Sequence, residues 1–281
     1  MDFFKEIIPS ALPIIIPVAV LAVIAVVSAV LLTVASSLFG VKENEKFAPV
    51  RDCLPGANCG ACGYSGCDAY AKALAEGKTE NATLCVPGGE DCAKSISSIL
   101  GIEAGTVISR VAYIRCNGNC DAVERKYRYE GHLSCRTADM AYSGDKACAF
   151  ACLGYGDCAA VCPKNAIFLS DGVAKVDPKK CIGCGICVRT CPNNIISLYN
   201  ESSRIAVACS NRDKGALTRK YCINGCIGCG KCARSCPAEA ISVIDNLAVI
   251  NYNKCISCGK CAEVCPTHCI HEVNFKCGSE K

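Results

Sequence analysis

The stretch that decides the fold of this chain is Cys226-Ile-Gly-Cys229-Gly-Lys-Cys232-Ala-Arg-Ser-Cys236-Pro237. Its cysteines follow the spacing C-x2-C-x2-C-x3-C-P, which is typical of 4Fe–4S cluster ligands. Three cysteines at this spacing surround one cluster, and the fourth, before the proline, reaches a neighbouring cluster. The pattern therefore predicts thiolate-bound 4Fe–4S clusters and a protein that carries electrons.

The same loop recurs along the chain. Two further runs are complete, namely Cys181, Cys184, Cys187, Cys191 and Cys255, Cys258, Cys261, Cys265. A fourth run, ending at Cys162-Pro163, has Tyr155 in the place of a ligand, and Cys148, four residues before Cys152, is the predicted replacement. Exchange of the last ligands between paired runs predicts four ligand sets: Cys148, Cys152, Cys158, Cys191; Cys162, Cys181, Cys184, Cys187; Cys226, Cys229, Cys232, Cys265; and Cys236, Cys255, Cys258, Cys261.

A different cysteine pattern lies nearer the N-terminus. Cys59-Gly-Ala-Cys62-Gly-Tyr-Ser-Gly-Cys67 precedes an expected helix over residues 68–77, and Cys85 follows. The spacing C-x2-C-x4-C-x17-C offers four ligands for one cluster. This set raises the number of expected clusters to five, held by twenty cysteines.

Five cysteines remain that could supply a sixth cluster. Cys135 lies thirteen residues before Cys148, and Cys209 lies thirteen before Cys222, so these positions repeat. The candidates for a sixth set are Cys116, Cys120, Cys135, Cys209 and Cys222. The alternative is that they are buried free thiols. Structural roles are expected for Cys53, Cys92, Cys269 and Cys277.

Disulfide bonds and zinc sites could also use many of the 29 cysteines among these 281 residues. Closely spaced cysteine pairs are poor disulfide partners, and a third cysteine followed by Cys-Pro argues against zinc. Thiolates of this kind need a reducing compartment, which places them in the cytoplasm. The formal charge of +4 becomes about −6 when five clusters of about −2 each are added. A basic nucleic-acid-binding protein is therefore not expected.

The N-terminal segment predicts a membrane anchor. Residues 11–39 are almost wholly apolar and long enough to span a bilayer as one helix. A cleaved signal peptide is the alternative, which the acidic residues Asp2 and Glu6 disfavour. Because the clusters need the cytoplasm, residues 40–281 are expected on the cytoplasmic side of the inner or plasma membrane.

The predicted fold class is α+β, with a single transmembrane helix, a small Fe–S module and two ferredoxin-like modules of two 4Fe–4S clusters each. Short hairpins are expected over residues 166–176 and 240–251, because turn residues separate two apolar runs in each. The expected domains are 1–40 (anchor), 41–109 (N-terminal 4Fe–4S module and linker), 110–208 (first ferredoxin-like module with extra cysteines) and 209–281 (second ferredoxin-like module).

These motifs together resemble the B subunit of the Rnf complex, and the likeness covers essentially the whole chain. The motif from Cys59 to Cys67 behind one helix, followed by ferredoxin repeats, carries the resemblance. The stretch from Cys116 to Cys226 resembles the extended form found in clostridia and other anaerobes. The resemblance implies an ion-pumping membrane assembly that oxidises ferredoxin and reduces NAD, in which the B subunit is the electron entry point. It also implies soluble ferredoxin, other Rnf subunits and membrane lipid as partners.

The residues themselves assign only electron transfer to this chain. No Gly-rich dinucleotide fingerprint follows a predicted strand, and one uncharged helix makes no ion path. NAD binding and ion translocation are therefore expected in partner subunits. The alternative function is a stand-alone polyferredoxin carrier attached to the membrane. Basic residues near the cysteine loops are expected to dock an acidic donor: Lys179, Lys180, Arg189, Lys231, Arg234 and Lys260.

Overall fold

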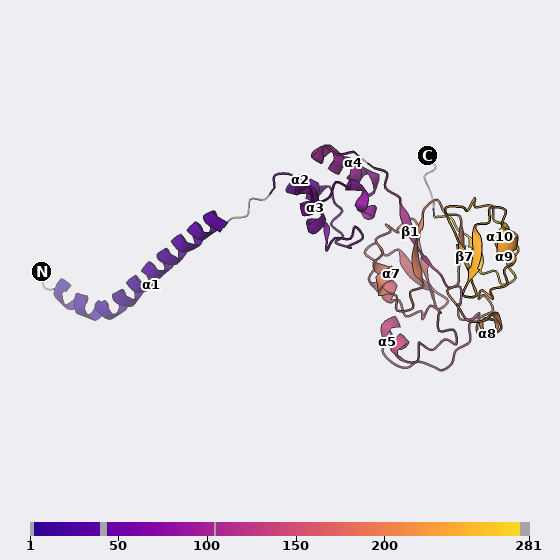
Figure 1. Cartoon of the computed structure of the whole chain (residues 1–281). Coiled ribbons are helices and arrows are strands. Elements are labelled where there is room, and N and C mark those ends of the chain that lie inside the picture. Colours follow the sequence, from indigo (N-terminus) through magenta and orange to yellow (C-terminus); the bar gives the residue numbers. More distant parts are fainter. Residues whose placement is uncertain (1–2, 40–43, 104, 276–281) are drawn as a thin grey trace. The chain divides into compact units, whose positions relative to one another are not determined.

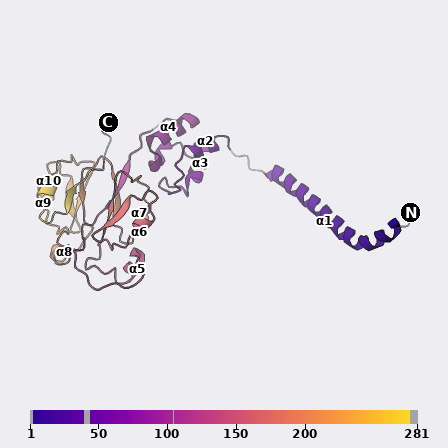
Figure 2. The same cartoon turned by 180° about the vertical axis from the view of Figure 1, so that it is seen from behind.

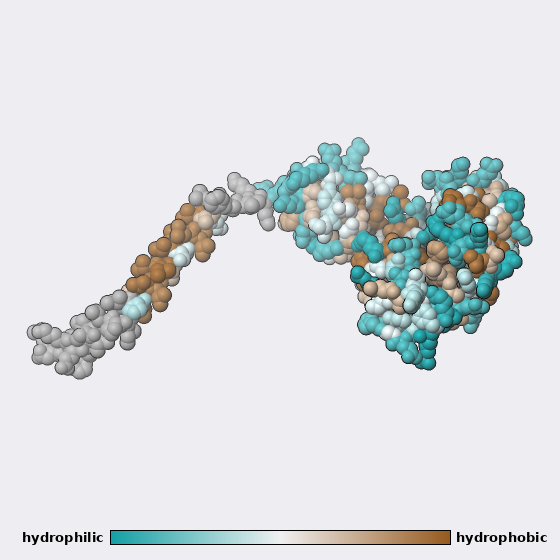
Figure 3. Space-filling view, turned by 60° about the horizontal axis from the view of Figure 1, so that its bottom comes forward, coloured by the Kyte–Doolittle hydropathy of each residue, from teal (hydrophilic) through white to brown (hydrophobic). Residues whose placement is uncertain are grey.

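The computed structural model describes residues 3–39, 44–103 and 105–275 (Figure 1). The chain forms two compact units, residues 1–45 and residues 46–281. The first unit contains helix α1, Phe3–Phe39. Its segment Pro17–Ser36 is 20 residues long, apolar enough to cross a membrane, and unburied. Figure 3 shows apolar side chains over this described part of α1. Length and composition make α1 a candidate membrane span.

The second unit starts with a small helical part. Its elements are α2 (Phe47–Asp52), α3 (Cys67–Ala75), the short 3-10 helices η1 (Ala82–Leu84) and η2 (Val86–Gly88), and α4 (Gly89–Leu100). Val50, Tyr70 and Ile96 are almost fully buried and form a core with Cys67 and Cys85. The helix α3 lies where the sequence predicts one.

The described residues in the rest of the second unit form four two-stranded antiparallel sheets. The pairs are β1 (Arg110–Ile114) with β4 (Ile196–Asn200), β2 (Ile167–Ser170) with β3 (Val173–Val176), β5 (Ile205–Val207) with β8 (Ile270–Glu272), and β6 (Ile241–Ile244) with β7 (Leu247–Ile250). Both predicted hairpins are present. Their turns, Asp171-Gly172 and Asp245-Asn246, have positive φ at both residues, as two-residue hairpin turns require.

A short helix follows most cysteine loops. These helices are α6 (Asp157–Ala160), α7 (Ile186–Thr190), α9 (Lys231–Arg234) and α10 (Lys260–Glu263), while α5 (Cys135–Met140) and α8 (Gly215–Tyr221) precede loops. Figures 1 and 2 show α9 and α10 at one edge of this unit and α7 nearer β1. The mixed helix and strand content agrees with the expected α+β class.

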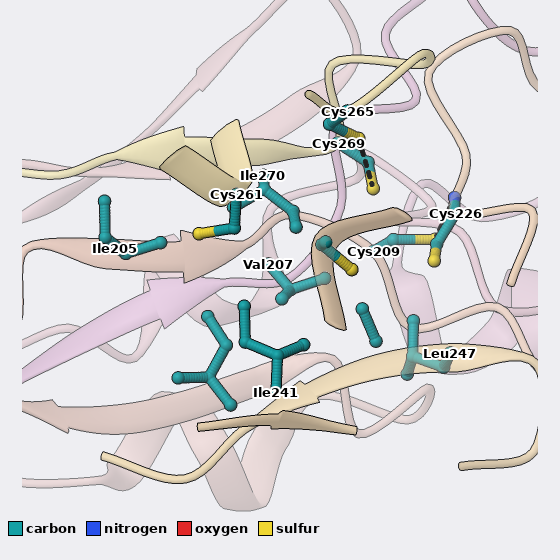
Figure 4. Packing of buried hydrophobic residues seen from close by; sticks show 13 residues of the cluster. Ile205, Val207, Cys209, Cys226, Ile241, Leu247, Cys261, Cys265, Cys269 and Ile270 are labelled. Atoms are coloured by element: carbon teal, nitrogen blue, oxygen red, sulfur yellow. Dashed lines mark hydrogen bonds between the residues drawn. The ribbon is translucent and has the colours of Figure 1, made fainter. Parts of the chain in front are cut away.

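Cysteine sulfur fills much of the core of both ferredoxin-like parts. In the C-terminal part, Ile205, Val207 and Ile270 pack with Cys226 and Cys261, as Figure 4 shows. The strand β5 precedes residue 209 yet pairs with β8. The second ferredoxin-like fold therefore uses residues that precede the boundary expected from the sequence.

Candidate iron–sulfur sites

The cysteines of the second ferredoxin-like part lie close together in the structure. Four of them line one small cavity, and we name them the Cys226 group: Cys226, Cys229, Cys232 and Cys265. Cys255 and Cys258 both act electrostatically on Cys261. Cys236 packs against the same core as Cys255 and Cys261. We name these last four the Cys255 group.

The first ferredoxin-like part has an equivalent set in Cys162, Cys181, Cys184 and Cys187, the Cys181 group. Cys162 and Cys181 both act electrostatically on Cys184 and Cys187. In the helical part, Cys59 and Cys85 act in the same way on Cys62. Cys67 and Cys85 pack in the same buried hydrophobic core. We name Cys59, Cys62, Cys67 and Cys85 the Cys59 group.

The structure does not place Cys148 with Cys152, Cys158 and Cys191. Cys135 lines a cavity with those three instead, and we name these four the Cys135 group. The Asp157 carboxylate explains this arrangement, because it accepts hydrogen bonds from the N–H groups of Cys135 and Arg136, both at the start of α5. Asp157 precedes Cys158 directly. This contact between distant segments brings Cys135 to the Cys158 loop.

Cys148 lies in a sixth group, at a separate cavity. That cavity is lined by Cys116, Cys148, Cys209 and Cys222, which we name the central group. Three of the five cysteines left over by the sequence motifs belong to it. Cys120 does not, because it is exposed and lies 3.9 Å from an Arg125 nitrogen. The thirteen-residue repeat of Cys135/Cys148 and Cys209/Cys222 was the sequence signal for these positions, but it did not show which cysteines converge.

Backbone N–H groups surround the central group with donors suited to thiolate sulfur. Cys116 Sγ accepts from the N–H of Cys152 at 3.3 Å and of Gly118 at 3.4 Å. Cys209 Sγ accepts from the N–H of Cys226 at 3.3 Å and of Asn211 at 3.4 Å. The amide Nδ2 of Asn211, a residue only 2% exposed, is 3.4 Å from Cys148 Sγ. Such bonds stabilise the charged form of a thiol.

Similar bonds reach other groups. Ala112 N–H donates to Cys181 Sγ at 3.4 Å, Ala166 N–H to Cys162 at 3.3 Å, and Ala240 N–H to Cys236 at 3.3 Å. Within the described ranges, no three His, Cys, Asp or Glu side chains are placed to hold a single metal ion.

Burial controls the protonation of these thiols. It raises the pKa of Cys148 and of Cys158 to about 12, and that of Cys209 to about 11. A thiol with such a pKa keeps its proton at neutral pH unless a metal takes up the thiolate charge. Cluster insertion is therefore expected to release protons.

Two of the cysteines expected to be structural lie against candidate ligands. Cys269 Sγ is 3.6 Å from Cys265 Sγ (Figure 4), and its hydrogen bond lowers the pKa of Cys265 to about 4. Cys92 makes a similar contact with Cys85, which raises the pKa of Cys92. Cys53 donates to the Pro49 carbonyl at 3.3 Å. Cys277 lies outside the described residues.

Comparison with known protein families supports iron–sulfur clusters in two parts of the chain. An Fe–S cluster family model matches residues 54–87, which contain the Cys59 group. A 4Fe-4S dicluster domain model matches residues 220–266, and a second one matches residues 180–240. The small module and the ferredoxin-like loops within residues 180–266 therefore belong to iron–sulfur domains.

Three curated relatives match most of the chain. The B subunit of the Na(+)-translocating ferredoxin:NAD(+) oxidoreductase complex of Acetobacterium woodii is 42% identical over 92% of this chain and 77% of its own length. The B subunit of the proton-translocating complex of Clostridium ljungdahlii is 38% identical over 85% and 84%. The B subunit of the ion-translocating oxidoreductase complex of Methanosarcina acetivorans is 38% identical over 84% and 90%.

The chain belongs to the family of Rnf B subunits. As a member of this family it is an iron–sulfur electron-transfer subunit of a multi-subunit oxidoreductase complex, and it is membrane-associated. The B subunit of Rhodobacter capsulatus, by contrast, matches only 30% of this chain, at 40% identity. The first three relatives therefore match a much longer part of this Rnf protein than the Rhodobacter capsulatus subunit does. This agrees with the resemblance of the stretch from Cys116 to Cys226 to the extended form of the subunit.

Proposed function

We propose that this chain takes electrons from reduced ferredoxin and delivers them through six 4Fe–4S clusters to partner subunits of an ion-pumping ferredoxin:NAD oxidoreductase. The observation that carries the proposal is the convergence of 24 cysteines into six groups of four. The names of the Acetobacterium woodii and Clostridium ljungdahlii relatives state the ferredoxin:NAD(+) reaction for those proteins. A bound 4Fe–4S cluster would supply the one-electron chemistry that the thiols themselves lack.

Contacts between groups support a continuous series. The Arg189 guanidinium of α7, in the Cys181 group's loop, donates to the Cys59 carbonyl, and Cys59 acts electrostatically on Cys184. Cys187 acts in the same way on Cys158, which connects the Cys181 and Cys135 groups.

The central group continues the series. The N–H groups of Cys152 and Cys226 both donate to its sulfurs, so it adjoins the Cys135 group and the Cys226 group. The Cys226 and Cys255 groups share one core. The proposed order is Cys59, Cys181, Cys135, central, Cys226 and Cys255.

The donor is proposed to dock on exposed lysines. Lys179, Lys180, Lys231 and Lys260 are exposed beside the cysteine loops. Arg189 and Arg234, also expected to dock the donor, make hydrogen bonds within the protein. The guanidinium of Arg189 donates to the Cys59 carbonyl, and that of Arg234 donates to the Cys229 carbonyl at 3.2 Å. The lysines are therefore the better candidates for steering an acidic ferredoxin, and the rate of reduction should fall as salt increases.

The membrane topology follows from the anchor and the thiolates. We infer that α1 spans the bilayer once, in contact with lipid, and that residues 46–281 face the cytoplasm. NAD binding and ion translocation are assigned to partner subunits. Digestion of sealed right-side-out and inside-out vesicles tests the topology. Protection of the cluster-bearing part in inside-out vesicles would reject it.

Purification from native membranes tests the function. Co-purifying integral subunits, with ferredoxin-dependent NAD reduction by the whole complex, are expected. The second candidate, a stand-alone polyferredoxin, predicts that the chain purifies without integral partners yet still accepts electrons from ferredoxin. If reduced ferredoxin fails to reduce the iron-replete chain both in the complex and in the chain purified alone, both functions are contradicted.

A further inference from the structure

Lys146 is a buried lysine that lies at the junction of two cysteine groups. The residue is 1% exposed. Its Nζ donates to the carbonyls of Gly118 and Gly172, each at 2.9 Å. Gly118 is two residues from Cys116 of the central group, and Gly172 lies in the turn between β2 and β3. Buried lysines are rare because loss of water around the ammonium is costly.

No acidic side chain neutralises this lysine within the described residues. The carboxylate next to it in sequence, Asp145, pairs with Arg125 at 2.5 Å instead. The two carbonyl partners of Lys146 carry no formal charge. The ammonium is therefore left to interact with the sulfurs around it.

The residues that hold this ammonium lie beside ligands of both groups. Gly118, whose carbonyl accepts from Lys146, donates its own N–H to Cys116 Sγ at 3.4 Å. Ala174, two residues after Gly172, donates its N–H to Cys152 Sγ at 3.4 Å. One lysine thus favours negative charge on both sides of the junction. Its position coincides with the step between the Cys135 group and the central group.

We propose that Lys146 is a positioning residue that raises the reduction potentials of the central and Cys135 groups. The proposal rests on the proposed function, because it requires clusters at both groups. Reduction adds one electron to a group and changes no bond, so the negative charge there increases by one. A fixed buried ammonium stabilises that charge, whereas a solvated lysine is screened by water and salt. Raising both potentials together favours electron entry into these two groups from the Cys181 group and leaves the difference between the two groups little changed.

The test is an EPR-monitored redox titration of the full-length, cluster-loaded chain in detergent. Lys146→Met and Lys146→Gln remove the charge, and glutamine keeps N–H donors for the carbonyls. With unchanged iron content, both variants should shift two of the one-electron steps to lower potential. At a fixed solution potential, the reduced-to-oxidised ratio should fall about tenfold, equivalent to about 59 mV for one electron. Lys146→Arg should restore most of the shift.

Lys175→Met is the matched control, because Lys175 is an exposed lysine on β3 of the same hairpin. It should leave all steps unchanged. Iron-replete Lys146→Gln with unshifted steps would overturn the proposal, as would an equal shift in Lys175→Met. Loss of iron from both neutral variants would give Lys146 a purely structural role and also overturn it. Absence of 4Fe–4S clusters from the unmodified chain would instead refute the proposed function.

Discussion

The backbone N–H of Cys226 donates a hydrogen bond to Sγ of Cys209 over 3.3 Å. The first ferredoxin-like part repeats the arrangement, since the N–H of Cys152 donates to Sγ of Cys116 over the same 3.3 Å. In both parts, the first cysteine of a ferredoxin loop thus bonds a sulfur of the central group. The central group therefore lies between the two parts rather than inside either one.

Replacing Cys135 or Cys148 should remove different clusters. Cys135→Ala and Cys148→Ala should each lose about four irons per chain, or leave a 3Fe form, and the double variant should lose about eight. The reason is that each residue completes a different group of four. Iron and acid-labile sulfide analysis measures the effect. Cys120→Ala is the control and should lose none; a double variant no worse than either single one would contradict the assignment.

The fully loaded chain should contain about 24 irons and 24 acid-labile sulfides, because six groups would each hold one 4Fe–4S cluster. Cys209→Ala and Cys222→Ala should each reduce this by about four, while leaving the Cys226 group loaded. Anaerobic reconstitution followed by metal analysis provides the numbers. A value near 20 in the unmodified chain, unchanged by either substitution, would show that the central group holds no cluster.

Cys269→Ala should lower the reduction potential of one cluster without loss of iron. The Cys269 thiol lies 3.6 Å from Cys265 Sγ, and a hydrogen bond to a ligand sulfur stabilises the reduced state. Redox titration followed by EPR measures the shift. Cys53→Ala is the matched control, because its thiol donates to a backbone carbonyl. Loss of about four irons from Cys269→Ala would instead make Cys269 a ligand.

Asp157→Ala should weaken the Cys135 group. The carboxylate accepts hydrogen bonds from Cys135 N–H at 2.9 Å, Arg136 N–H at 3.1 Å and the Ser134 hydroxyl at 2.9 Å. Loss of hydrogen bonds to a charged group of this kind costs about 1.5–3 kcal/mol of unfolding free energy. Denaturant titration followed by cluster absorbance should show an earlier loss of one cluster. The exposed Asp121 provides the control, since Asp121→Ala should not move the transition.

Deletion of residues 1–45 should release a folded, cluster-bearing chain from the membrane. Residues 46–281 form their own compact unit, and the candidate membrane span lies entirely in the other. Membrane fractionation and iron analysis test this prediction. Retention of the truncated chain by lipid vesicles free of other subunits would place a second membrane contact in residues 46–281.

The sequence alone determined the cofactor class and predicted most members of the cysteine groups. The loop spacing around Cys181, Cys226 and Cys255 is local, since backbone geometry holds cysteines two or three residues apart around one centre whatever the rest of the chain does. The hairpins at Asp171-Gly172 and Asp245-Asn246 were predictable for the same reason, because turn chemistry depends on adjacent residues. The apolar span of α1 needed only length and composition.

Only the tertiary structure decided how the isolated cysteines are shared. Cys148 is four residues from Cys152, yet it joins Cys209 and Cys222, while Cys135 reaches Cys152 from seventeen residues away. These choices depend on contacts between distant segments, such as Asp157 with Cys135 and Asn211 with Cys148. Spacing along the chain carries no information on such contacts, because the packing of the two ferredoxin-like parts sets which thiols share a cavity.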